Sequence, residues 1–406
     1  MPERKSGLAA VPRGVWALGF VSLCMDLSSE TIHALLPLYM ATVLGASTTT
    51  IGIVEGVAES IALVVKMFAG VLSDWTRRRK PLVLLGYGLA AVTKFILPLA
   101  PTLGWVVTAR FADRVGKGIR GAPRDALIAD LTPGNARGAS FGLRQALDTV
   151  GAIGGPLVAI GAMAWFAGNF QAAFWIACVP AVVCVIVIIV GVDEPKSAAT
   201  ARADGKPRAP LAWSDAKRLP REFWVVVAIA AVLTLARFSE AFLLLRAQNV
   251  GFTVGEAPWV MVAMTIVYAT TSYPSGAAAD RGYGPRLLAG GLASLIAADL
   301  LLAQATGATL VLAGAALWGL HMGLTQGLLS ALVAASAPAD LRGSAFGVFN
   351  LASGAALLVA SALAGYLWDT AGPRFTFYAG AAFTAAAWIA LLIHGRGSLG
   401  RLSAST

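Results

Sequence analysis

Twelve apolar runs, each of about 20 residues, recur along this sequence and are separated by short polar or Pro/Gly-rich breaks. A run of that length crosses the hydrocarbon core of a bilayer as a helix. In lipid every backbone polar group needs a partner within the protein, so only helices and closed barrels span a membrane. The runs lack the two-residue alternation of barrel strands. The sequence therefore predicts an all-α membrane protein with twelve transmembrane helices.

The net charge of +10 is explained by where the basic residues lie. They fall before the first run, after the second and fourth runs, and in the polar segment 193–222, which carries seven Lys and Arg residues. The intervening loops, at 41–50, 101–104, 164–170 and 305–308, carry none. By the positive-inside rule we expect a multi-pass protein of a bacterial-type inner membrane with both termini in the cytoplasm. Nucleic acid is not an expected partner, and we expect a monomer surrounded by lipid.

An internal repeat divides the chain into two halves. The segment 193–222 has the composition of a linker and separates residues 1–192 from residues 223–406, with six runs on each side. Three stretches of the first half recur in the second, at offsets of 210, 206 and 205 residues: Ser29-Glu30 with Ser239-Glu240, "GVLSD" (70–74) with "GAAAD" (276–280), and "PGNARGASFG" (133–142) with "PADLRGSAFG" (338–347). Such repeats are typical of secondary transporters, whose site lies between the halves near the bilayer midplane.

At these motifs the chain resembles the major facilitator superfamily. The segment "GVLSDWTRRRK" (70–80) is similar to that family's loop between spans two and three, and Arg114, Gly118 and Gly121 resemble its span-four pattern. The resemblance implies two pseudo-symmetric six-helix bundles that give alternating access to a cavity lined by spans one, four, seven and ten. We also expect gate contacts between short loops and helix ends, from Asp74 with Arg78 and Arg79, and from Asp280 with Arg281.

The fifth run resembles the proton-coupled efflux branch of that superfamily, which includes the drug/proton antiporters. The matching residues are Gly142, Gly151, Gly155 and Pro156. This resemblance implies an antiporter that moves a small molecule outward against protons. We expect Gly151, Gly155 and Pro156 to set the bend and the close packing of this helix.

The stretch "RFADRVGKGIRGAPRDALIAD" (110–130) places charge inside the fourth run. On a helix seven of its eight charged residues share one side, within an arc of about 140°: Arg110, Asp113, Arg114, Lys117, Arg120, Arg124 and Asp125. A charge at mid-bilayer costs at least about 2.5–3.5 kcal/mol, so this stripe must face the protein interior and needs partners. The first five runs contain eight acidic and eight basic residues, whereas the second half is much poorer in charge.

The first run supplies acids that suit ion coupling. Asp26, Glu30 and His33 share a helix face by their spacing. We hypothesise that Asp26 and Glu30 carry protons and that Arg114 is the switching counter-charge, as the resemblance to drug/proton antiporters also implies. The alternative is a static network of ion pairs. Further candidates line the substrate cavity: His33, Arg110, Lys117, Arg120, Arg237, Glu240 and His321.

Other functions fit the sequence less well. "GKGIRG" (116–121) matches a dinucleotide fingerprint but lies inside an apolar run rather than after a strand. His33, His321 and His394 are the chain's histidines, and no nucleophile–base pair or zinc-helix motif is visible, so we expect neither an enzyme nor a cofactor. A receptor would not need the charged repeat. Two alternatives within transport stay open, namely a divalent metal ion and an anionic metabolite.

Overall fold

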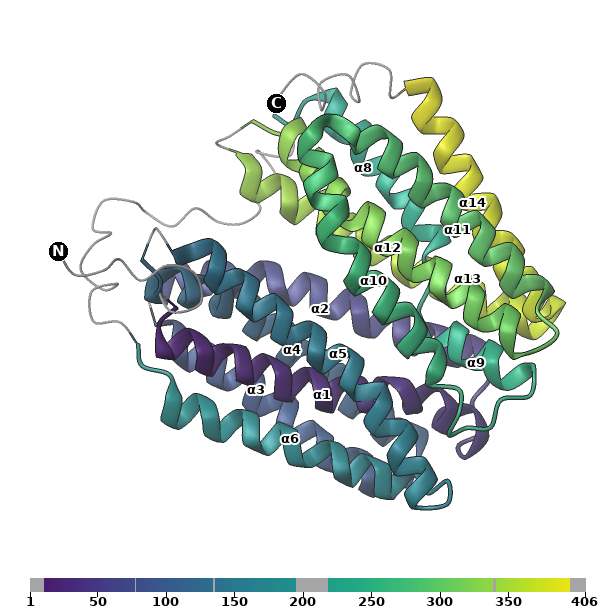
Figure 1. Ribbon diagram of the computed structural model, residues 1–406, viewed down its shortest axis with the longest axis horizontal. Helices are drawn as coiled ribbons and strands as arrows, with labels where there is room; N and C mark the ends of the chain where they lie inside the picture. The colour runs from purple at the N-terminus through teal and green to yellow at the C-terminus, as the bar shows by residue number, and fades with distance from the viewer. Residues whose placement is uncertain (1–10, 77, 134–135, 195–217, 339–340, 395–406) are drawn as a thin grey trace. The chain divides into compact units, whose positions relative to one another are not determined.

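The computed structural model describes residues 11–76, 78–133, 136–194, 218–338 and 341–394, and every regular element in those ranges is helical (Figure 1). Six long helices precede the central segment: α1 (Arg13–Thr42), α2 (Thr48–Thr76), α3 (Arg79–Ile96), α4 (Leu103–Leu131), α5 (Arg137–Trp165) and α6 (Phe170–Gly191). Seven follow it: α8 (Arg221–Ala236), α9 (Ala241–Asn249), α10 (Trp259–Ala278), α11 (Gly284–Gln304), α12 (Ala308–Ser336), α13 (Arg342–Ala371) and α14 (Pro373–His394). The all-α prediction is confirmed.

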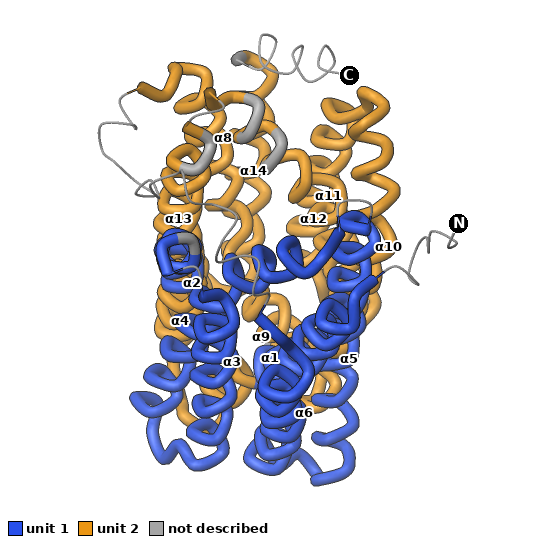
Figure 2. The backbone as a smooth tube through the Cα atoms, turned by 90° about the vertical axis from the view of Figure 1, so that its left-hand side faces the viewer, with its two compact units in different colours: residues 1–35, 61–209 blue, residues 36–60, 210–406 orange. Residues whose placement is uncertain are grey.

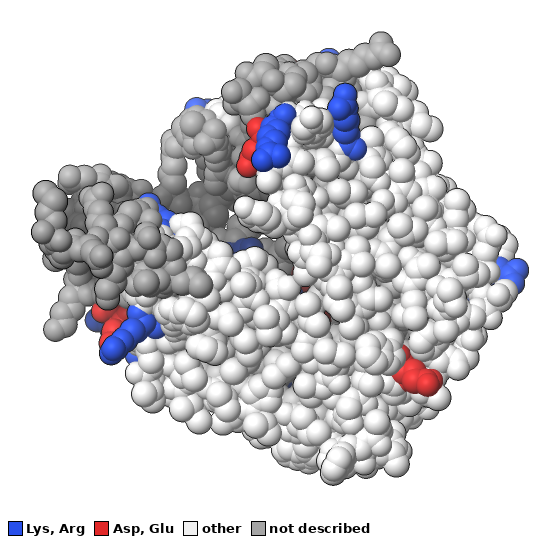
Figure 3. All heavy atoms as spheres, viewed as in Figure 1, with Lys and Arg blue, Asp and Glu red and all other residues white. Residues whose placement is uncertain are grey.

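The surface of these helices suits lipid. Within the described residues, nine helical stretches are long and apolar enough to cross a membrane. The two helices α2 and α4 are not among them, and α4 carries the charged stripe. Large apolar side chains are exposed elsewhere, including Trp165 at 85% and Val190 at 80%. On the face drawn in Figure 3 charged side chains are few and wide uncharged surface separates them. This distribution fits a hydrocarbon environment.

The chain divides into two compact units (Figure 2). The first unit comprises residues 1–35 and 61–209, and the second comprises residues 36–60 and 210–406. The second unit thus includes the first half of α2, which packs on α13. Thr49 donates hydrogen bonds to Asp369 Oδ2 from its backbone nitrogen (2.8 Å) and its hydroxyl (2.6 Å), and a Cβ on Gly56 would lie 2.9 Å from the backbone of Leu358.

In the first unit, small residues let the helices approach one another closely. A Cβ on Gly86 of α3 would lie 2.8 Å from the carbonyl oxygen of Gly116 on α4, and a Cβ on Gly118 would lie 2.6 Å from Val65 of α2. Glycine is therefore needed where these backbones meet. The charged stripe of α4 is held between α2 and α3 by this packing.

In the second unit, the expected seventh span is broken. Residues 237–239 are not helical, so α8 ends at Ala236 and α9 begins at Ala241. The sequence around the break contains neither proline nor glycine. Side-chain hydrogen bonds stabilise it instead, because Ser361 Oγ accepts the Ser239 N–H at 3.1 Å and Ser239 Oγ accepts the Ala241 N–H at 3.2 Å. Glu240 therefore sits at a helix break, whereas its repeat partner Glu30 lies inside a continuous α1.

The next two helices are joined without a conventional loop. A kinked turn, η5 (Ala279–Tyr283), connects α10 to α11. Its sharp point is Gly282, whose φ of 86° lies in the left-handed region that favours glycine. This turn carries Asp280 and Arg281, and both side chains are exposed.

Candidate functional site

The innermost charges of the first unit form an ion pair between neighbouring helices. Lys94 Nζ of α3 donates to Asp113 Oδ1 of α4 at 2.8 Å and to Ser29 Oγ of α1 at 3.1 Å. The Nε atom of Arg114 lies 3.5 Å from the other carboxylate oxygen of Asp113. Lys94 and Arg114 are each 2% exposed. Because desolvation of two charges is costly, such a pair is stable only when both members are present.

The α1 acids lie against this cluster from the other side. Glu30 Oε2 is 3.3 Å from His33 Nδ1, and the basic groups of α4 that act on Glu30 are Lys117 and Arg114. Asp26, one turn earlier, is surrounded by Asp148 on α5 and by arginines of α4. The structure thus brings Asp26, Glu30, His33, Arg114 and Lys117 together within the first unit. Arg114 is shared between Asp113 and Glu30, a competition that the sequence did not indicate.

Helix α5 holds the two acids in place through its glycines. A Cβ on Gly151 would lie 2.7 Å from the Leu23 carbonyl oxygen and 3.0 Å from Asp26 Cβ. A Cβ on Gly155 would lie 2.5 Å from Glu30 Cβ, and the hydroxyl of Thr31 donates to the Gly155 carbonyl at 3.0 Å. Both positions therefore bring the α5 backbone against the carboxylate-bearing turns of α1. Pro156 follows directly and is buried inside α5.

A second network surrounds these acids. Arg144 Nη1 donates to Asp148 Oδ2 at 2.7 Å, and Arg124 Nε donates to Asp125 Oδ1 at 3.1 Å. Arg124 also donates to the hydroxyl of Tyr87 on α3 at 3.3 Å.

The remaining basic residues of α4 differ in exposure. Arg120 stacks over the Tyr87 ring, with its guanidinium carbon 4.7 Å from the ring centroid. Arg110 and Arg120 are buried at 3% and 5% exposure, whereas Lys117 is exposed. Tyr87 was not identified from the sequence, because a tyrosine in an apolar run carries no signal that it contacts arginines.

The candidates of the second unit lie around the break between α8 and α9. Arg237 is within electrostatic range of Glu240 and of Tyr268 on α10, and it also acts on His321 of α12. His321 is completely buried, and its Nδ1 lies 2.8 Å from the Gly291 carbonyl oxygen. Because a carbonyl accepts only from a protonated nitrogen, this contact assigns the proton to Nδ1. Arg237, Glu240 and His321 therefore share one neighbourhood within the second unit.

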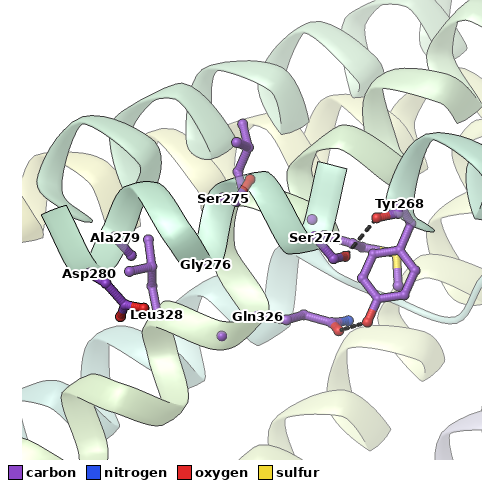
Figure 4. A pocket seen from close by; sticks show the side chains of 12 residues that line it. Tyr268, Ser272, Ser275, Gly276, Ala279, Asp280, Gln326 and Leu328 are labelled. Atoms are coloured by element: carbon purple, nitrogen blue, oxygen red, sulfur yellow. Dashed lines mark hydrogen bonds between the residues drawn. The ribbon is translucent and has the colours of Figure 1, made fainter. Parts of the chain in front are cut away.

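A cavity of about 310 Å³ opens between α10 and α12 of the second unit (Figure 4). The Tyr268 hydroxyl donates to Gln326 Oε1 at 3.0 Å, and the Ser272 hydroxyl donates to the Tyr268 carbonyl at 2.6 Å. Asp280 lies at the opposite end of the cavity from Tyr268. Its volume is at the lower end of the range for small-molecule sites, about 300–1,000 Å³. Sequence reasoning missed Tyr268 and Gln326, because they lie on different helices of an apolar repeat.

The expected gate residues are placed in part. The side chain of Asp74 lies outside the described residues, and that of Arg78 is exposed. Arg79 Nη1 forms an ion pair with Asp130 Oδ2 at 3.1 Å, so α3 is tied to the end of α4. Asp280 and Arg281 lie together in η5, and Asp280 also lines the cavity.

Among the described side chains, no group of three or more His, Cys, Asp and Glu residues is placed to hold a metal ion. The polar groups concentrate on facing helices inside each unit, which is where helical transporters place their sites.

Comparison with known proteins assigns the family. The sequence pattern of the Major Facilitator Superfamily matches residues 18–246 and again 238–401. An uncharacterized MFS-type transporter of Methanocaldococcus jannaschii is 31% identical over 94% of both chains. The inner membrane transport protein YajR of Escherichia coli is 24% identical over 93% of this chain and 82% of its own.

Solved structures share the fold at low sequence identity. The nucleoside transporter NupG superposes with a TM-score of 0.77 at 15% identity, over 95% of this chain and 100% of its own. A POT family transporter superposes with a TM-score of 0.75, also at 15% identity, over 95% of this chain and 96% of its own. The helical fold, the internal repeat and these matches lead to one conclusion: the chain belongs to the major facilitator superfamily and is a multi-pass membrane transporter of small molecules, not an enzyme.

Proposed function

We propose that this chain is a proton-coupled antiporter that exports a small molecule by alternating access. The observation that carries the proposal is the placement of Asp26 and Glu30, one turn apart on α1, between the glycines of α5 and the basic residues of α4. A carboxyl group in such a position exchanges a proton when the distance to its basic neighbours changes. The span-five resemblance to efflux antiporters supports the outward direction.

Charge balance gives the coupling mechanism. Arg114 acts on both Glu30 and Asp113, and Asp113 is also paired with Lys94. When Glu30 takes up a proton it no longer attracts Arg114, so the guanidinium interacts more strongly with Asp113. A state that separates α1 from α4 therefore favours protonated Glu30, and a state that closes them favours its release. Asp26 responds in the same way to the arginines of α4.

The proposal includes the topology expected from the sequence. Residues 1–192 and 223–406 form the two bundles, and the segment 193–222 crosses between them in the cytoplasm together with both termini. The basic loops support this orientation. The transporter acts as a monomer in the inner membrane, and Asp74, Arg78, Arg79, Asp280 and Arg281 latch its cytoplasmic face.

Transport in everted vesicles tests the coupling. We expect Asp26→Asn and Glu30→Gln each to abolish pH-driven accumulation of substrate, because the substituted side chain can no longer carry a proton. The matched control is Asp125→Asn, whose carboxylate is 41% exposed and pairs with its own neighbour Arg124. Undiminished pH-driven transport in both single variants and in the double variant would refute the proposal.

An anionic metabolite is the second candidate substrate. Helix α4 carries the exposed Lys117 and, buried on the same side, Arg110 and Arg120, and such basic groups suit a carboxylate or phosphate group. The same vesicles, with a pH-sensitive dye, separate the candidates when they are offered cationic drugs, anionic metabolites and divalent metal ions in turn. Proton movement driven by an anionic metabolite alone would support this second candidate.

A further inference from the structure

Asp299 of α11 is a buried carboxyl group that the coupling mechanism does not use. Its residue exposure is 0%, and neither carboxyl oxygen has a hydrogen-bond partner among the described residues. It also takes part in none of the ion pairs found there. An ionised carboxylate cannot be kept in such surroundings, because nothing replaces the water that it has lost. The neutral acid is the form that fits.

The surroundings of Asp299 are apolar on the sides that the structure defines. Helix α14 presents Gly380, where a Cβ would lie 2.7 Å from Asp299 Oδ2. The same point is 3.1 Å from the ring of Phe238, which lies in the break between α8 and α9. The ring of Phe238 is packed in turn by Trp318 at 5.3 Å and Phe377 at 5.6 Å between centroids. These aromatic rings exclude water from this side of the carboxyl group.

The charged and titratable groups of the helices around Asp299 are engaged elsewhere or exposed. On α12, His321 contacts the carbonyl of Gly291, about two turns before Asp299. On α14, Arg374 and Tyr378 are exposed, as are Asp280 and Arg281 of η5.

The arginines near Asp299 have other partners. On α9, Arg246 donates to the carbonyl oxygens of Leu302, Ala303 and Ala305 at the end of α11. On α11 itself, Arg286 stacks over Tyr283. At the break, Arg237 interacts with Glu240 and Tyr268.

We propose that Asp299 is a proton-binding site of the second unit, closed by Gly380 and Phe238 and opened by movement of the break between α8 and α9. Binding forms one O–H bond on the carboxylate with a proton from water, and release returns that proton to water. The break suits the role of a gate, since residues 237–239 are not helical and serine hydroxyls accept the N–H groups of Ser239 and Ala241. Broken helices at ion sites are a recurrent device of transporters.

This site deepens the proposed proton coupling but does not depend on Asp26 or Glu30. Infrared spectroscopy of the full chain in lipid nanodiscs tests it without any transport. A protonated carboxylic acid has a carbonyl band that a carboxylate lacks, and labelling aspartate with carbon-13 assigns the band to aspartate. We expect such a band in the wild type at neutral pH, its loss in Asp299→Asn, and its persistence in Asp26→Asn.

The gate is tested on the same band by transfer into heavy water. Exchange of the carboxyl proton for deuterium shifts the band, and we expect this shift to develop faster in Phe238→Ala than in the wild type. Phe375→Ala, which truncates an exposed ring of α14, is the matched control and should leave the rate unchanged. The wild-type band itself covers the case in which a variant does not fold, because it is measured without any substitution. A wild type with no protonated aspartate at neutral pH, or a band unaffected by Asp299→Asn, would overturn the proposal.

The experiments distinguish a failure of the proposed coupling site on α1 from a failure of the proposed Asp299 site. If Asp26 and Glu30 prove dispensable for transport while the Asp299 band is present, the coupling site is wrong and the Asp299 site stands. If the band is absent and the α1 variants abolish pH-driven transport, the reverse holds.

Discussion

Asp113 in the first unit and Asp299 in the second are both buried carboxyl groups on long helices, but of the two only Asp113 has counter-charges among the described residues. Lys94 lies 2.8 Å from Asp113 and Arg114 lies 3.5 Å from it, whereas Asp299 faces a glycine and an aromatic ring. The first unit therefore holds charge as a network in which each member depends on another. The second unit holds one acid that is stable only when neutral. Burial alone does not say which kind of site a membrane acid forms, because its partners decide.

The largest effect should follow from breaking the pair of the first unit. Asp113→Asn leaves Lys94 buried without its closest counter-charge, which costs about 3–5 kcal/mol of folding stability. Thermal unfolding in detergent measures this loss, and Asp299→Asn should unfold close to the wild type. The double variant Asp113→Asn with Lys94→Met is the control and should recover most of the stability. Equal effects of Asp113→Asn and Asp299→Asn would remove the distinction between the units.

The second largest effect should follow from disrupting the close contact between α5 and α1 in the first unit. Gly155→Leu places side-chain atoms where Glu30 and Thr31 already lie, and such overpacking costs about 1–3 kcal/mol. We expect transport to be impaired while membrane insertion is retained. Gly161→Leu on the same helix is the matched control, since among the described residues no atom of another helix lies within 4 Å of its Cβ position. Transport assays and quantification of the protein in membranes separate the two outcomes, and normal transport by Gly155→Leu would contradict the role of this contact.

A smaller effect is expected where the second unit does use a charge. Asp369 accepts hydrogen bonds from the first backbone N–H groups of α2, where a negative charge is favourable to a helix by about 0.3–1 kcal/mol. Asp369→Ala should lower the unfolding temperature slightly, and Asp369→Asn should retain part of the hydrogen bonding. The effect of Asp369→Ala should also shrink in high salt, in contrast to that of Asp113→Asn. A salt-independent loss would show that packing rather than charge is responsible.

The smallest effect should come from the outer network of the first unit. Asp125 is 41% exposed beside Arg124, and exposed ion pairs contribute less than about 1 kcal/mol. Asp125→Asn should therefore leave both unfolding and transport near wild type. If Asp125→Asn were as damaging as Asp113→Asn, the exposed pair of Asp125 and Arg124 would contribute as much to stability as the buried pair of Lys94 and Asp113.

Periodicity in the sequence predicted the parts of this fold that depend on one helix at a time. The apolar runs predicted the membrane helices, and the spacing of Asp26, Glu30 and His33 predicted their shared face, confirmed for the last two by their 3.3 Å contact. The charged side of α4 was predicted for the same reason.

Contacts between helices could not be predicted in this way. The residues Lys94 and Asp113 lie 19 positions apart, and nothing in their spacing says that they pair. The break at 237–239 contains no helix-breaking residue that could have predicted it. It is stabilised by a hydrogen bond to Ser361 of α13, which is far away in the sequence. The isolation of Asp299 likewise depends on Gly380 of α14 and on Phe238, so a charge count of the second half gave its presence but not its surroundings.

The pair of Lys94 and Asp113 also constrains how this transporter can diverge. Because each residue is tolerated inside the helices only beside the other, a single replacement passes through a destabilised intermediate, while a joint replacement does not. Among related chains we therefore expect the two positions to be kept together or lost together. Asp299, which has no hydrogen-bond or ion-pair partner among the described residues, can change to a neutral residue in one step wherever its proton is not needed.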